Sequence, residues 1–271
     1  MTESRLTRHR LDDLRRLATD LASRVDVLPA RASALATYLL WFDAAGASSH
    51  GIATLPDWLD RIERKEIDAK AEGRAGFEHS GTALFDAKNG LGPLALQAAA
   101  GVAAEKARDV GVGLVRVRNV GPTGPAGPIA SGLAIGPFVA LVVGPGPSLA
   151  IAAPTAEGLP ALHDSALSGE GADLGDYGPW VSSIVGGDGW LILAVSVPAL
   201  EALGTFHERV GEALGLTARG SGPLRPGALE ASRREARERG VTIEPEAEVR
   251  LARWAERLGV AWPPGLVNKP G

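Results

Sequence analysis

The sequence predicts an α/β or α+β protein, with a mixed sheet flanked by helices and with helical segments at both ends of the chain. Leucines recur at helical spacing near the start, and charged residues alternate with apolar ones at helical spacing near the end. Between these parts, short apolar stretches with strand character alternate with longer helical ones, which is typical of a sheet packed against helices. The length of 271 residues suits one extended α/β domain or two smaller ones.

We expect three segments along the chain. The first is an N-terminal helical segment over residues 1–75, and the second is a shortened sheet core over residues 76–197, equivalent to a cofactor domain. The third is a C-terminal helical segment over residues 198–271, which packs with the first. A chain of this length buries enough surface to fold without disulfide bonds.

Helices dominate the first segment. Its leucines recur at steps of three to five residues and predict an amphipathic helix over residues 4–23. Pro29 suits the first turn of a second helix, which runs toward Gly46. A third helix is expected over residues 55–65, where charged residues alternate on the exposed face.

Strands and helices alternate in the rest of the chain. Apolar stretches predict strands over residues 82–86, 112–118, 138–143, 149–153 and 190–197. Helical periodicity predicts helices over residues 94–108, 198–214, 230–239 and 246–258. The polar, glycine-rich residues 165–189 show no period and are expected to form loops.

Composition excludes several classes of protein. The chain has no cysteine, which excludes thiol catalysis, iron–sulfur clusters and thiolate zinc sites. The net charge is −4, and arginines near residue 235 are interleaved with glutamates, so we expect a solvated helix face and no binding to nucleic acid. No apolar stretch resembles a secretory signal or a membrane span, and a cytoplasmic protein is expected.

A histidine in a turn is the first candidate for chemistry. Ser48, Ser49 and His50 precede Gly51 directly after the second predicted helix. A histidine with an ordinary pKa near 6.5 can donate a proton close to neutral pH, and an adjacent serine can orient its ring. The alternative is a histidine that only caps the turn or faces solvent.

Two longer stretches carry a resemblance to a known family. Residues 43–66 read DAAGASSHGIATLPDWLDRIERKE, and residues 82–119 read TALFDAKNGLGPLALQAAAGVAAEKARDVGVGLVRVRN. Together they resemble the type-2 malate/L-lactate dehydrogenase family, which includes ureidoglycolate, sulfolactate and cyclic ketimine reductases. The resemblance implies a homodimeric oxidoreductase with a fold that is not a Rossmann fold. It also implies reduction of a small 2-oxo acid or cyclic imine with NAD or NADP as cofactor. No G-x-G-x-x-G follows a predicted strand, which agrees with that fold.

The resemblance assigns roles to particular residues. His50 matches the active-site histidine and Ser49 its neighbouring serine, and the third member of a proton relay is Glu170 or Asp164. The residues that match the cofactor site are Asn119, Thr123, Gly124, Asp164, Ser165 and Ala166. Without the resemblance, His163, Asp164 and Ser165 are expected to lie in a surface loop. No metal site is expected, because the acids near Glu170 match no calcium-binding spacing.

Several positions depart from the family pattern. Thr54 stands where the family has an arginine, and Pro122 stands where it has a second histidine. The segments 144–148 and 170–189 are shorter than their family counterparts, and both contribute to the cofactor site there. A second hypothesis is therefore a protein without cofactor on the same scaffold, which is either a non-redox catalyst or a pseudoenzyme that pairs with a partner protein.

Overall fold

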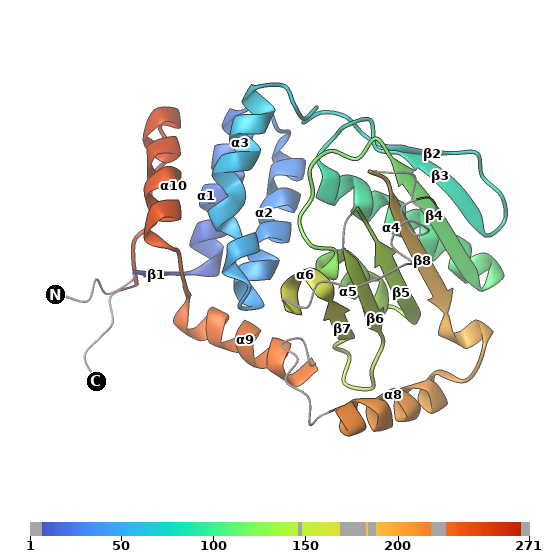
Figure 1. The fold of residues 1–271 in the computed structure, drawn as a ribbon. Coiled ribbons are helices and arrows are strands. Elements are labelled where there is room, and N and C mark those ends of the chain that lie inside the picture. Colours follow the sequence, from blue (N-terminus) through green and yellow to red (C-terminus); the bar gives the residue numbers. More distant parts are fainter. Residues whose placement is uncertain (1–6, 146–147, 169–182, 184–187, 218–225, 267–271) are drawn as a thin grey trace. The chain divides into compact units, whose positions relative to one another are not determined.

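The computed structural model describes residues 7–145, 148–168, 183, 188–217 and 226–266. The chain divides into two compact units (Figure 1). The first consists of Met1–Lys70 together with Leu229–Gly271, and the second consists of Ala71–Ala228.

Helices build the first unit. Those packed in its core region are α1 (Leu11–Arg24), α2 (Pro29–Ala44), α3 (Leu55–Glu63) and α10 (Pro245–Leu258), and they lie side by side in Figure 1. A further helix, α9 (Pro226–Arg239), precedes α10. As predicted, Pro29 lies in the first turn of α2, where its missing N–H costs no hydrogen bond.

The first helix begins later than the leucine pattern predicts. Arg8 and His9 form a short strand, β1, which pairs antiparallel with β9 (Val241–Thr242). This pairing joins the start of the chain to a segment more than 200 residues away, so no local pattern in the sequence indicates it. The expected helix over residues 4–23 therefore begins at Leu11 in the structure.

Apolar side chains from all of these helices meet in the core of the first unit. The fully buried members include Leu14, Leu21, Leu35, Leu39, Phe42, Leu55, Leu59 and Leu251. Those that share a helix lie three, four or seven residues apart, which places them on one face of that helix. This core holds the C-terminal end of α2, from which the histidine turn continues.

The second unit contains a seven-stranded sheet with the order β2-β3-β4-β8-β5-β6-β7. Its strands are β2 (Arg74–Gly76), β3 (Thr82–Asp86), β4 (Val112–Arg118), β5 (Phe138–Val143), β6 (Leu149–Ala153), β7 (Ala161–Asp164) and β8 (Trp190–Ser196). Strands β3 and β4 are parallel, and the other neighbouring pairs are antiparallel. The predicted mixed sheet with flanking helices is confirmed.

Two helices cover one face of this sheet. Helix α4 (Gly92–Val110) packs on β4 and β8, and α5 (Gly127–Ile135) packs on β5 and β6 and touches α4. Helix α5 was not expected, because its residues follow a stretch rich in glycine and proline. The short helix α6 (Ser165–Ser168) lies where a loop was expected, and α8 (Leu203–Thr217) begins later than predicted.

Helix α4 approaches the sheet closely because small residues meet at the contact. Ala99, Ala103 and Ala107 are fully buried and lie one turn apart on the face toward the sheet. A Cβ atom at Gly113 of β4 would lie 1.9 Å from the carbonyl oxygen of Ala103. A glycine is therefore required at this position, because the backbones of β4 and α4 lie too close together to admit a side chain.

Replacing this glycine is expected to destabilise the protein. Gly113→Ala should lower the free energy of unfolding by about 1–3 kcal/mol, because the helix backbone must move to admit the methyl group. Gly101→Ala is the matched control, since a Cβ there meets no atom within 4 Å. It should raise the stability by up to about 1 kcal/mol through helix propensity. Urea unfolding of both variants measures the difference, and equal effects would contradict the close contact.

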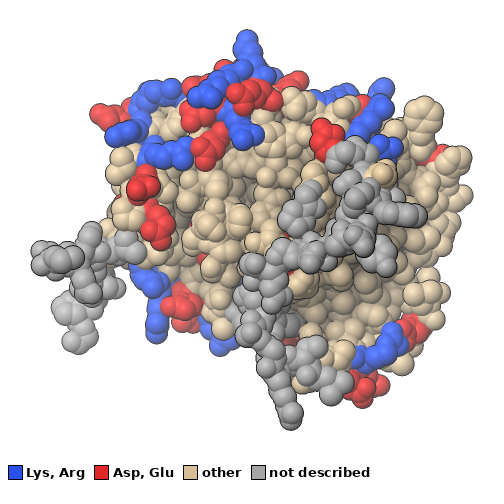
Figure 2. Space-filling view, viewed as in Figure 1, with Lys and Arg blue, Asp and Glu red and all other residues tan. Residues whose placement is uncertain are grey.

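The described surface carries charges of both signs. On the face shown in Figure 2, lysine and arginine side chains lie next to aspartate and glutamate side chains, most densely along the upper edge. The described residues of this face therefore form no large field of one sign. Among the helices that the structure describes, none combines the length and the apolar character needed to cross a bilayer.

Candidate functional site

The histidine turn follows α2 and consists of two short 3-10 helices, Ser48–His50 and Ile52–Thr54. The His50 side chain is half-buried, and its ring centroid lies 5.9 Å from that of the buried Phe42. Ser49 is exposed in the middle of the first 3-10 turn. The imidazole therefore rests against the apolar end of α2 while part of it remains open to solvent.

A buried carboxyl group lies beneath this turn. Asp43, in the last turn of α2, is only 4% exposed, and its Oδ2 accepts a hydrogen bond of 2.8 Å from the N–H of Ile52. A Cβ atom at Gly51 would lie 2.3 Å from Oδ1 of Asp43. The absence of a side chain at Gly51 thus lets the chain after His50 pass directly over the carboxyl group, which fixes the turn to α2.

Burial changes the protonation of Asp43. It raises the pKa of the Asp43 carboxyl from its usual value of 3.8 to about 7, and the hydrogen bond from the Ile52 N–H lowers it in part. Close to neutral pH the group is therefore divided between its protonated and ionised forms. Asp43 is not among the candidate residues predicted from the sequence. The sequence feature that could have indicated it is a single acidic residue within the apolar end of α2, seven positions before His50.

Thr54 closes the turn on its other side. Its hydroxyl donates a hydrogen bond of 2.9 Å to the carbonyl oxygen of Gly51. This bond stabilises the backbone of the second 3-10 helix. Thr54 therefore contributes a neutral, locally bonded group at the position where the resemblance leads one to expect an arginine.

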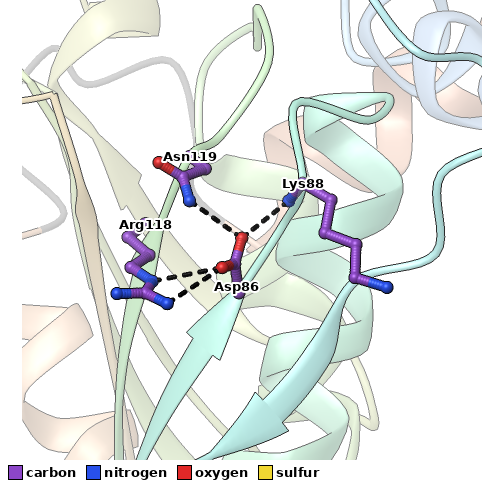
Figure 3. A network of polar contacts seen from close by, with 4 residues as sticks. All are labelled: Asp86, Lys88, Arg118 and Asn119. Carbon is purple, nitrogen blue, oxygen red and sulfur yellow. Dashed lines mark hydrogen bonds and ion pairs between the residues drawn. The ribbon is translucent and has the colours of Figure 1, made fainter.

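A polar network lies where the parallel strands β3 and β4 end (Figure 3). Oδ1 of Asp86 accepts hydrogen bonds of 3.0 Å from the Asn119 side-chain amide and from the backbone N–H of Lys88. Oδ2 of Asp86 accepts hydrogen bonds from Nε and Nη2 of Arg118, at 3.2 and 3.0 Å. The carboxylate therefore joins the segment after β3 to the segment after β4.

This network orients Asn119 and favours the ionised form of Asp86. The Asn119 amide, the Lys88 N–H and the Arg118 guanidinium all lower the pKa of the Asp86 carboxyl. Asn119 itself has φ 53°, a left-handed conformation that asparagine tolerates better than most residues. Its backbone carbonyl accepts a hydrogen bond of 2.7 Å from the Asn89 N–H, so both its backbone and its side chain are held in place.

Asp164 and Ser165 hold a second part of this unit together. Oδ2 of Asp164 accepts a hydrogen bond of 2.5 Å from the N–H of Gly127, the first residue of α5, and Oδ1 accepts one of 2.9 Å from the Ala166 N–H. The Ser165 hydroxyl accepts a hydrogen bond of 3.0 Å from the Leu149 N–H. Both side chains are buried, so the interpretation of these residues as a surface loop is wrong. Asp164 ends β7, and its carboxyl oxygens accept hydrogen bonds from backbone N–H groups at the start of α5 and of α6.

The exposure of the predicted cofactor residues shows which of them can contact a nicotinamide nucleotide. Asn119 and Ala166 are exposed, and Thr123 and Gly124 are half-buried, so these four can contact a ligand. They offer amide, hydroxyl and backbone groups, which suit the carboxamide and the ribose hydroxyls of the cofactor. Asp164 and Ser165 do not face outward but hold the segments that carry the others. Glu170 lies outside the described residues.

The loop before α5 packs against the start of α4. A Cβ atom at Gly92 would lie 2.2 Å from the carbonyl oxygen of Pro122, and one at Gly121 would lie 2.1 Å from the carbonyl oxygen of Gly90. The glycines in these two segments therefore allow the two backbones to touch. This contact holds the segment that carries Thr123 and Gly124, which lies three to four residues before Gly127 at the start of α5.

Comparison with known proteins identifies the family. The sequence profile of the family described as malate/L-lactate dehydrogenase matches residues 10–157, more than half of the chain. The chain therefore belongs to the malate/L-lactate dehydrogenase family, a class of oxidoreductases. An L-sulfolactate dehydrogenase from Methanocaldococcus jannaschii is 31% identical over 113 residues, which are 42% of this chain and 33% of the relative. The matched region thus spans about one third of that relative's length.

Solved structures share the fold over nearly the whole chain. The malate dehydrogenase from Pyrococcus horikoshii OT3 superposes with a TM-score of 0.84 at 19% identity, covering 98% of this chain and 99% of that chain. The delta1-piperideine-2-carboxylate reductase from Pseudomonas syringae has a TM-score of 0.77 at 19% identity, covering 92% of this chain and 99% of that chain. At this level of identity the likeness shows the fold.

Proposed function

We propose that this protein reduces a small 2-oxo acid or a cyclic imine with NADH or NADPH, and that His50 donates the proton. The observation that carries the proposal is the half-buried His50 in a turn anchored to Asp43. Membership of a dehydrogenase family supports the class of reaction. The names of the similar proteins, which include a sulfolactate dehydrogenase and a piperideine-2-carboxylate reductase, support both kinds of substrate as candidates.

His50 supplies the proton that the reduction requires. Imidazole gains and loses a proton more readily around neutral pH than other side chains, so His50 can donate a proton and take up another from solvent. The imidazolium donates to the oxygen of the carbonyl group or to the nitrogen of the imine. The product is then a 2-hydroxy acid or a cyclic amine. Asp43 is a positioning residue, because it holds the turn and not the substrate.

The nicotinamide, when bound, supplies the hydride that adds to the carbon of the same double bond. We propose that Asn119, Thr123, Gly124 and Ala166 contact the cofactor, and that Asp164 and Ser165 support them from behind. Asp86 holds the Asn119 side chain through its amide nitrogen, and the Asn89 N–H holds its backbone carbonyl, so the group that we propose for contact with such a ligand is the amide oxygen. The role of Glu170 in the proton relay remains a proposal from the resemblance alone.

A turnover assay tests this function. The purified protein is mixed with NADH or NADPH and with a set of 2-oxo acids and cyclic imines, and cofactor oxidation is followed by absorbance. We expect steady oxidation with at least one substrate and formation of the reduced product in equal amount. Oxidation of neither cofactor with any member of the set would contradict the proposal.

A second candidate function is a protein on this scaffold that performs no redox chemistry, either as a catalyst that uses His50 or as a pseudoenzyme bound to a partner. Thr54 favours it, because its hydroxyl bonds to the backbone and offers no charge for a substrate carboxylate. Affinity purification from cells separates the two candidates. Recovery of a stoichiometric partner without cofactor oxidation supports the second, and cofactor oxidation by the isolated protein rules it out.

A further inference from the structure

A groove in the first unit lies between the start of α1, the second half of α2 and the helix α9. Its volume is about 680 Å³, and four arginines line it together with Trp41. The arginines are Arg10 just before α1, Arg15 in α1, and Arg233 and Arg237 in α9. The sequence predicts that the arginines of α9 form a solvated face, and this is wrong for Arg233, which is half-buried.

The groove has an excess of positive charge. Arg15 is paired with Asp12 at 3.1 Å, so these two charges cancel. Among the described residues, no ion pair joins Arg10, Arg233 or Arg237 to a carboxylate, and the remaining acid in the lining is Glu238. Three guanidinium groups therefore share the groove with one carboxylate.

Arg233 is half-buried, whereas Arg10 and Arg237 are exposed. Its guanidinium lies over the ring of Trp41, with its Cζ atom 5.3 Å from the ring centroid. Burial lowers the pKa of the Arg233 guanidinium, and the positive charge of Arg237 lowers it further. Arg237 follows one helical turn later, so the two cations lie on the same side of α9. Two like charges one helical turn apart repel each other, and a bound anion would relieve that repulsion.

We propose that this groove binds a small anion with two negative charges, such as a phosphate group or a dicarboxylate. Guanidinium groups donate two parallel hydrogen bonds to phosphate and carboxylate groups, and the stacking on Trp41 fixes one of them in advance. The groove is formed by residues other than the histidine turn and the predicted cofactor residues. The proposal therefore does not depend on hydride transfer.

Calorimetric titration at low ionic strength tests the proposal with two probes, inorganic phosphate and succinate, each against sodium chloride of equal ionic strength. We expect saturable binding of at least one probe. Arg233→Gln and Arg237→Gln should each weaken it by about tenfold or more, since each removes hydrogen bonds to a charged group. Binding of phosphate alone identifies a phosphate group as the ligand, and binding of succinate alone identifies a dicarboxylate.

The matched control is Arg239→Gln, which removes an arginine of the same helix that is paired with Glu235 at 3.7 Å and does not line the groove. It should leave the dissociation constant unchanged. His50→Ala should also bind the probe like the unaltered protein, which separates this site from the proposed function. If Arg233→Gln does not fold, the more exposed Arg237→Gln still decides the outcome. Absence of saturable binding, or equal weakening by Arg237→Gln and Arg239→Gln, would overturn the proposal.

Discussion

Replacing His50 with alanine is expected to lower kcat by roughly 10²–10⁴-fold, which is the usual contribution of a positioned acid or base. The substitution removes the group that donates the proton and leaves Asp43 and the Ile52 N–H in contact. Folding should therefore be retained, as measured by circular dichroism and by the unfolding transition. The assay is cofactor oxidation with the best substrate of the turnover set, at saturating concentrations.

The pH profile adds a second readout. A rate limited by protonated His50 should fall as pH rises through the pKa of the histidine, and His50→Ala should lack this limb. His79→Ala is the control, because His79 is exposed on a loop of the other unit and has no proposed role. Equal rates for His50→Ala and the unaltered protein would remove His50 from the mechanism.

Stability should depend on pH through the buried Asp43. Its pKa is 3.8 in its usual state and about 7 in the folded protein, so between these values the folded state binds the extra proton. The free energy of unfolding should therefore be greatest below pH 4 as far as this group is concerned, and should fall as pH rises toward 7. Because the two pKa values differ by about three units, the free energy of unfolding should fall by up to roughly 4 kcal/mol between pH 4 and pH 7.

Asp43→Asn should remove this contribution, because the amide can accept the Ile52 N–H bond and does not ionise. Urea unfolding at pH 5 and pH 7 measures the effect as the difference between the variant and the unaltered protein. Asp20→Asn, at an exposed position of α1, is the control and should leave the pH dependence as it is. The stability difference between Asp43→Asn and the unaltered protein should therefore change between pH 5 and pH 7. If it is the same at both pH values, Asp43 is ionised throughout, which contradicts the raised pKa.

Most of the sheet could be predicted from the sequence because its strands carry a local signal. The bounds of β3, β4, β5 and β6 agree with the predicted ranges residue for residue, since apolar residues recur in each strand and a polar residue, glycine or proline stands at its end or directly after it. Strand β7 was missed because His163 and Asp164 interrupt its apolar pattern. Helix α5 was missed because Gly127 and Pro128, which suit a first helical turn, also suit a loop.

The candidate site was predictable only in part, for a physical reason. His50 and Ser49 stand in a recognisable turn, whereas Asp43 acts through its burial, which depends on the packing of the whole helical unit. Asp164 likewise bonds to Gly127, 37 residues earlier in the chain. Contacts between residues so far apart in the chain produce no local pattern that could be recognised in the sequence. Because of such contacts, Asp164 and Ser165 are buried and bonded to the backbone of other segments, although the resemblance implies that they contact a ligand.

Titration of the purified protein with NADH and with NADPH tests whether this chain performs the nicotinamide-dependent chemistry that the family resemblance implies. Tryptophan fluorescence reports binding, since the chain contains six tryptophans and their emission overlaps the absorbance of both reduced cofactors. We expect saturable quenching by at least one of the two at submillimolar concentration, and weaker quenching of the Asn119→Ala variant. Absence of saturation by either cofactor up to millimolar concentration would contradict it.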